Sequence, residues 1–195
     1  FDSLGVHAIH SSPVNVGREY NLLSMREKSF EEFKLCLESQ KGRRVIANFG
    51  MDPLMGKYHR SYCPNCRSII NGEAATRVCP YCSSSKLVVG VYDRIMEIKD
   101  YDSPHHPVNR PPYHRRVPLS SLPGISKQRA ERLIAQFGSE IELVEKAEIS
   151  QVFKIGGETL GIMIKAMREG RLPIAPGGGG HYGKVLKLKN WSLSP

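Results

Sequence analysis

The chain has 195 residues, of which 40% are hydrophobic, and carries a formal net charge of +9. This length suits one or two domains with ordinary small cores. No apolar run approaches the roughly 20 residues that a transmembrane helix needs, and we expect the protein to have no secretory signal. The lone Cys36 fits a reducing compartment, so the composition excludes a membrane-spanning protein and predicts a cytoplasmic one.

The charge is distributed unevenly between the two halves of the chain. Residues 1–104 carry 14 Lys and Arg against 12 Asp and Glu, whereas residues 105–195 carry 14 against 7, a net charge of +7. An excess of this size suits a polyanion such as nucleic acid. A basic surface without a partner is the alternative.

Residues 1–56 have the pattern of an α/β segment. Phe30, Phe33 and Leu37 recur on one face of a helix predicted over residues 29–39, and a strand is predicted over residues 44–49. One such unit cannot cover both faces of its own sheet. We therefore expect this segment to be the end of a larger α/β domain whose beginning lies upstream.

Four cysteines form two pairs with the spacing of a metal site. Cys63 and Cys66 make one Cys-x-x-Cys knuckle, and Cys79 and Cys82 make the second. Two such knuckles are typical of a closed tetrahedral zinc site, which stabilises structure and leaves no position for a reactive water. Two disulfides or four unrelated thiols are the alternatives.

The residues around these pairs complete the prediction of a zinc ribbon over residues 57–99. Asn71-Gly72 indicates a hairpin between the knuckles, and a strand is predicted over residues 86–91. Residues 100–117 are rich in proline and are predicted to be an extended connector. His105 and His106 in this connector are either additional metal ligands or solvated side chains.

Residues 118–195 are predicted to form a small helical domain with a Gly-rich loop and a strand over residues 184–189. Leu122-Pro-Gly-Ile-Ser126 precedes a helix closed by Gly138, as in a helix-hairpin-helix element. Backbone amides at such a turn are placed to bind a phosphate, and basic side chains on the helix can reach neighbouring phosphates. A weaker second copy lies at residues 154–158.

Two such hairpins can hold both strands of duplex DNA without reading the bases. The candidate DNA contacts are Gly124, Ile125, Ser126, Lys127, Arg129, Arg132, Gly156 and Gly157. Ordinary helix turns that need glycine are the alternative, and Glu158 adds a negative charge to the second copy.

Five motifs, in this order, resemble endonuclease Q and its relatives over nearly the whole chain. They are Gly56-Lys-Tyr-His59, the ribbon from Cys63, Val91-Tyr-Asp-Arg-Ile95, Arg116-Val-Pro-Leu119 and Pro176-Gly-Gly-Gly-Gly-His-Tyr-Gly183. The resemblance implies a PHP (polymerase and histidinol phosphatase) barrel, a zinc-binding domain and a helical domain. It also implies nicking of DNA on the 5′ side of uracil, hypoxanthine or an abasic site.

Residues 1–56 would then be the last piece of the PHP barrel, in which the family has an Asp-x-His metal motif. Here the stretch reads His7-Ala8-Ile9-His10, so His10 matches the histidine and Ala8 stands at the aspartate. Alanine cannot replace a carboxylate ligand. The resemblance therefore implies a catalytic divalent metal only in an intact PHP domain, with His10 as a residual ligand at most.

Three functional hypotheses follow. The first is the DNA-binding, zinc-containing C-terminal portion of an endonuclease Q-like repair enzyme that acts on damaged double-stranded DNA. The second is a stand-alone DNA-binding adaptor with a lost or degenerate PHP domain, and the third is a module that binds only protein. A sliding clamp is a further candidate partner, although residues 189–195 lack the glutamine-anchored pattern of a clamp-binding peptide.

Overall fold

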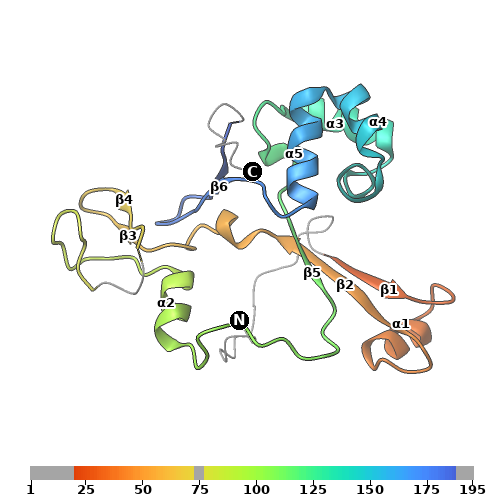
Figure 1. Ribbon diagram of the computed structural model, residues 1–195, viewed down its shortest axis with the longest axis horizontal. Helices are drawn as coiled ribbons and strands as arrows, with labels where there is room; N and C mark the ends of the chain where they lie inside the picture. The colour runs from red at the N-terminus through yellow and green to blue at the C-terminus, as the bar shows by residue number, and fades with distance from the viewer. Residues whose placement is uncertain (1–19, 73–76, 188–195) are drawn as a thin grey trace.

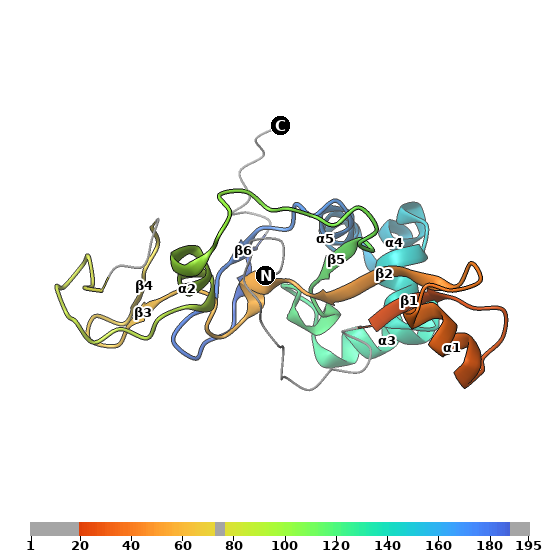
Figure 2. The ribbon, with the colours of Figure 1, turned by 90° about the horizontal axis from the view of Figure 1, so that it is seen from below.

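The computed structural model describes residues 20–72 and 77–187. Its elements in chain order are β1 (Tyr20–Ser24), α1 (Phe30–Leu37), β2 (Arg44–Met51), η2 (Pro53–Met55), β3 (Tyr62–Cys63), β4 (Ser68–Ile69), α2 (Val91–Ile98), β5 (Tyr113–Arg116), η3 (Leu119–Ser121), α3 (Lys127–Phe137), η4 (Glu142–Lys146), α4 (Ile149–Gly156), α5 (Glu158–Arg168), β6 (Ile174–Ala175) and β7 (Lys184–Val185). The mixed content confirms the predicted α+β class. The region around β3, β4 and α2 lies at one end of the molecule and α1, β1 and β2 lie at the other (Figures 1 and 2).

The first sheet has the strand order β1-β2-β5. β1 and β2 are antiparallel, whereas β5 runs parallel to β2, from the pair Asn48–Tyr113 to the pair Met51–Arg116. The His114 ring stacks on Phe49 with 4.6 Å between ring centroids. The segment predicted only as an extended connector therefore joins the sheet of the N-terminal region, a pairing that periodicity cannot show.

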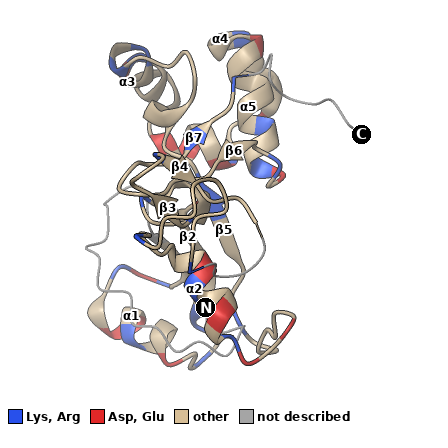
Figure 3. Cartoon of the chain, turned by 90° about the vertical axis from the view of Figure 1, so that its left-hand side faces the viewer, with Lys and Arg blue, Asp and Glu red and all other residues tan. Residues whose placement is uncertain are grey.

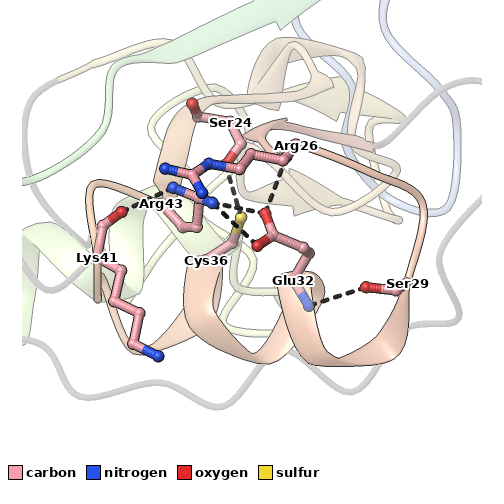
Figure 4. Close-up of polar contacts among 7 residues, drawn as sticks. All are labelled: Ser24, Arg26, Ser29, Glu32, Cys36, Lys41 and Arg43. Atoms are coloured by element: carbon pink, nitrogen blue, oxygen red, sulfur yellow. Dashed lines mark hydrogen bonds and ion pairs between the residues drawn. The ribbon is translucent and has the colours of Figure 1, made fainter.

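A buried ion pair and a buried thiol hold α1 against this sheet (Figure 4). Arg43 donates from Nη2 to Oε1 of Glu32 at 3.0 Å and from Nε to Oε2 at 2.5 Å. These hydrogen bonds lower the pKa of Glu32. Cys36 is fully buried, and its Sγ donates to the carbonyl of Ser24 at 3.1 Å, so this thiol is part of the packing.

The apolar face predicted for α1 is exposed. Phe30, Phe33 and Leu37 have exposed fractions of 75%, 40% and 60%. The predicted helix and strand are otherwise confirmed, as α1 and β2.

The second sheet pairs β3 with β4 across the first cysteine knuckle, with Cys63 opposite Ser68. The hairpin predicted around Asn71-Gly72 falls partly on residues 73–76, which lie outside the described residues. A strand over residues 86–91 is not found. Val88 makes only an isolated bridge with Tyr62, and Val91 begins α2.

Tertiary contacts position α2, a helix that was not predicted from the sequence and that follows the expected strand. Asp93 is 3% exposed, and its Oδ2 accepts the Ser61 amide at 2.7 Å, while Oδ1 lies 3.3 Å from Nη2 of Arg60. A Cβ on Gly90 would lie 2.2 Å from the carbonyl carbon of Arg60. The chain therefore passes close to residues 60–61 at Gly90 and turns there into a helix that brings the carboxylate inward.

The main hydrophobic core lies among the helices α3, α4 and α5. Its fully buried members are Leu119, Leu143, Val152, Leu160, Met163 and Ile164. Gly138 ends α3 with φ of +86°, which confirms the predicted helix end, and Gly170 follows α5 with φ of +67°. Among the described helices, none is long and apolar enough to span a membrane.

The Gly-rich loop packs onto residues 54–60, at the start of the ribbon. The Gly177 amide donates to Leu54 and its carbonyl accepts from Arg60, while Gly180 donates to the carbonyl of Lys57. A Cβ on Gly177 would lie 2.3 Å from the carbonyl oxygen of Gly56, so only glycine fits there. The loop leads into β7, which pairs with β6. The strand predicted over residues 184–189 is therefore shorter than expected. Residues 186 and 187 are not in a strand, and residues 188 and 189 lie outside the described range.

Candidate metal centre and nucleic-acid interface

The four predicted cysteines converge at one point. Their sulfur atoms all lie within 4.8 Å of one another, and within the described ranges no other group of metal-binding residues forms. Cys63 and Cys82 are 3.6 Å apart at Sγ, as are Cys66 and Cys79. An S–S bond of about 2.05 Å is absent, and all four thiols are free.

The sulfur separations suit a four-coordinate metal. With Zn–S bonds of about 2.3 Å, the edge of an S₄ tetrahedron measures about 3.8 Å, close to the observed 3.6 Å. The structure therefore assembles the ligand set that the spacing predicted. Histidines of the connector are not part of it.

Hydrogen bonds and burial make the four thiols unequal. The Asn65 side chain donates to Sγ of Cys82 at 3.4 Å, and this bond, with one from the Ser84 amide, lowers the pKa of Cys82 to about 6. Burial raises the pKa of Cys79 to about 11. The hydrogen bonds to Cys82 thus favour its thiolate, the form that a metal ligand requires, whereas burial disfavours the thiolate of Cys79 in the same knuckle.

The first candidate DNA contact is an open glycine turn ahead of α3. Gly124 has φ of +78°, and no atom lies within 4 Å of the Cβ position on that glycine. The Ile125 amide is used in a bond to the carbonyl of Leu122 at 3.2 Å, and the Ser126 hydroxyl caps α3 by accepting the Arg129 amide at 3.2 Å. Among the predicted contacts, Ile125 is buried and Ser126 exposed.

The second candidate turn is much shorter than predicted. α4 continues to Gly156, and α5 begins at Glu158, so Gly157 alone links them with φ of +82°. Gly157 is exposed with open space at its Cβ position. Gly156 is buried, and a Cβ there would lie 2.4 Å from the Leu160 side chain. Of this glycine pair, Gly157 faces outward and Gly156 serves packing.

The basic residues of α3 differ in what they contact. Lys127 is exposed, 4.0 Å from Glu131, and Arg132 is exposed. Arg129 is half-buried and donates from Nη1 to the carbonyl of Gly124 at 3.1 Å and from Nη2 to the carbonyl of Gly156 at 2.7 Å. One guanidinium thus bridges the two turns, a role that no sequence pattern indicated.

A second cluster that sequence reasoning did not select lies where the Gly-rich loop meets the ribbon. Nζ of Lys57 lies over the ring of Tyr182, 4.6 Å from its centroid, and both residues are exposed. In the sequence, Lys57 lies in the motif at residues 56–59 and Tyr182 in the motif at residues 176–183, but the contact between them was not predicted. His10, Ala8 and His7 lie outside the described residues.

Comparison with known proteins finds the same family that the sequence motifs resemble. No known protein-family model matches the chain. The chain is similar to the lesion-specific endonuclease PfuEndoQ of Pyrococcus furiosus, with a TM-score of 0.72 and 29% identity over 91% of this chain and 47% of that one. It is also similar to endonuclease Q bound to a 27-mer duplex with an abasic lesion at the active site, with a TM-score of 0.69 and 32% identity over 90% of this chain and 47% of that one.

The chain resembles about half of endonuclease Q. This bears out the resemblance that the motifs indicated. Among curated proteins, the uncharacterized YqxK of Bacillus subtilis is 37% identical over 87% of this chain and 43% of its own length. The uncharacterized MJ0043 of Methanocaldococcus jannaschii is 33% identical over 92% of this chain and 24% of its own length. The chain thus spans less than half of these relatives and of the endonuclease Q chains.

Proposed function

We propose that the chain is the DNA-binding, zinc-containing portion of an endonuclease Q-like repair enzyme that nicks DNA on the 5′ side of deaminated bases or abasic sites. Its contact with DNA is a pair of helix-hairpin-helix turns at Gly124 and Gly157. The observation that carries this proposal is that both glycines have positive φ and open space at their Cβ positions, with Gly124 three residues before α3 and Gly157 directly before α5.

Turns of this kind suit phosphate. The first amides of a helix have no partner within the helix, and the helix dipole adds partial positive charge at the same end. A glycine at the turn allows a phosphate oxygen to approach the backbone closely. Lys and Arg lie on α3 and α5 (Figure 3). On α3 they follow the first turn, so backbone and side chains favour the same ligand there, whereas the basic residues of α5 lie in its last turn, away from Gly157.

The zinc proposal rests on the four-sulfur cluster. Four cysteine ligands complete a tetrahedron, so the metal has no open position for substrate or water. Bound zinc would hold the two knuckles together, next to the short β3–β4 pair. We therefore assign it a structural role, and any catalytic metal would belong to an intact PHP domain.

The exposed apolar surface of the N-terminal region favours a portion of a larger enzyme over a stand-alone adaptor. Leu22 and Ile46 on the sheet are 47% and 41% exposed and accompany the exposed face of α1. Apolar patches of this kind usually contact another surface. Residues 1–56 would be the last piece of a PHP barrel, whose remainder would cover these exposed side chains. An open reading frame that extends upstream with intact His and Asp metal motifs would support the enzyme, and one without them would support the adaptor.

DNA binding is testable through its salt dependence. Each phosphate contact made by a Lys or Arg side chain contributes about 0.9 to the slope of log K against log salt on duplex DNA. We expect Lys127→Ala and Arg132→Ala each to reduce the slope by up to this amount and to weaken all sequences alike. Fluorescence anisotropy at several salt concentrations measures it, with Lys34→Ala on α1 as the control. Unchanged slopes in both variants would remove α3 from the interface.

Catalysis gives a second test. We expect the 195-residue chain to leave a labelled duplex containing one deoxyuridine uncut in magnesium or manganese. Metal-assisted cleavage needs several ligands on the same ion, and this chain has Ala8 at the aspartate position. Site-specific nicking that disappears in His10→Ala would contradict this expectation and place a working active site in these residues.

A further inference from the structure

We infer that Arg129 is a positioning residue that fixes the separation of the two glycine turns, so that both engage the phosphates of one duplex together. This inference rests on the proposed function and deepens it. It assigns to Arg129 a role that differs from the direct phosphate contact expected of a basic residue on α3.

The geometry places the guanidinium between the turns. Nη1 donates to Gly124, in the first turn, and Nη2 donates to Gly156, directly before the second turn. The two acceptors lie at very different distances from Arg129 in the sequence. Gly124 is 5 residues before it, and Gly156 is 27 residues beyond it. One planar guanidinium and its two hydrogen bonds therefore set the distance between the carbonyl oxygens of Gly124 and Gly156.

The remaining contacts of Arg129 fix the base of its side chain. Its amide donates to the Ser126 hydroxyl in the cap of α3, which ties the backbone of Arg129 to the same turn. The side chain is half-buried, while Lys127 and Arg132 on the same helix are exposed. Two nitrogens of the fork donate to carbonyls in the protein, so the main task of this side chain is to join the turns.

Only arginine combines these two bonds. Its guanidinium is planar, with donors in a fixed fork, whereas the lysine ammonium is a single point on a flexible stem. Lysine keeps the positive charge but does not hold two separate carbonyls at a set spacing. Arg129→Lys therefore separates a positioning role from a charge contact.

The matched experiment compares Arg129→Lys with the unchanged chain on a 20-base-pair duplex. Two contacts on one rigid body bind far more tightly than one, often by a hundredfold or more. We expect at least about tenfold weaker binding and a smaller salt slope, although the net charge is the same. Equal affinity and slope would overturn the inference, since a phosphate contact by Arg129 would be largely retained by lysine.

A double-mutant cycle measures whether the losses of DNA affinity from two variants add, which distinguishes a positioning role from general stabilisation of the fold. Gly157→Val disables the second turn. If Arg129 acts by holding that turn in place, Arg129→Lys added to Gly157→Val should cause no further loss of affinity. Additive losses would instead assign Arg129 a contact of its own and overturn the inference. Thermal melts confirm that each variant is folded at the assay temperature.

A measurement on the unchanged chain keeps the inference testable if a variant does not fold. Amide hydrogen exchange with and without the duplex should show protection of residues 124–128 and 157–160 at the same DNA concentration. Protection of one turn alone would overturn joint engagement. No binding of duplex DNA by the unchanged chain would instead refute the proposed function itself, so the two failures are distinguishable.

Discussion

Replacing Cys63 with serine is expected to abolish zinc binding and to disorder the ribbon. The unchanged chain should hold one zinc ion per molecule, because its four sulfurs already lie at the separations of a tetrahedral site. Structural zinc contributes roughly 10–16 kcal/mol in small zinc-binding peptides, far more than the β3–β4 pair can provide. Elemental analysis gives the metal content, and the NMR amide dispersion of residues 57–99 gives their order.

Cys36→Ser is the matched control for this loss. Cys36 is also a buried thiol, but its partner is the Ser24 carbonyl near α1, and a serine hydroxyl can donate to the same acceptor. This variant should keep one equivalent of zinc. A protein that contains no metal, or that forms disulfides among the four cysteines under reducing conditions, would contradict the zinc assignment.

Replacing Gly124 with valine should weaken DNA binding by about tenfold or more on every sequence tested. The side chain would occupy the open space in front of the turn, where a phosphate would approach the backbone. A β-branched residue at φ of +78° is also strained, by roughly 1–2 kcal/mol. We expect the backbone of the turn to shift in order to relieve this strain. Binding is measured by fluorescence anisotropy and folding by thermal melting.

Gly138→Val separates these two effects. Gly138 lies at the other end of α3, has φ of +86° and has no atom within 4 Å of its Cβ position. It should therefore suffer similar strain and a similar loss of stability, yet bind DNA as the unchanged chain does. Equal binding by folded Gly124→Val and the unchanged chain would make the first hairpin a structural turn only.

A link between the two glycine turns changes how the basic residues of α3 are interpreted. By sequence alone, Lys127, Arg129 and Arg132 are equivalent candidates for phosphate contacts. In the structure, two of them are exposed and the third bonds to both turns. The side chains that provide charge and the side chain that provides spacing can therefore be tested separately.

Local sequence alone was sufficient for several features. The paired Cys-x-x-Cys spacing identified the sulfur cluster, because a tight knuckle places two thiolates on one side of the chain. The spacing of Phe30, Phe33 and Leu37 predicted α1, and Gly138 predicted the end of α3. The order of the motifs identified the resemblance to endonuclease Q. Each of these features depends on residues close together in the chain or on short motifs.

Other features depended on contacts between distant residues. α2 was not predicted, and it is held in place by the burial of Asp93 against residues 60–61. β5 joined β2 across more than 60 residues, and the Gly-rich loop docked on residues 54–60. The role of Arg129 was decided in the same way. Its local pattern indicates only an exposed cation, and a carbonyl 27 residues away determines where its guanidinium lies.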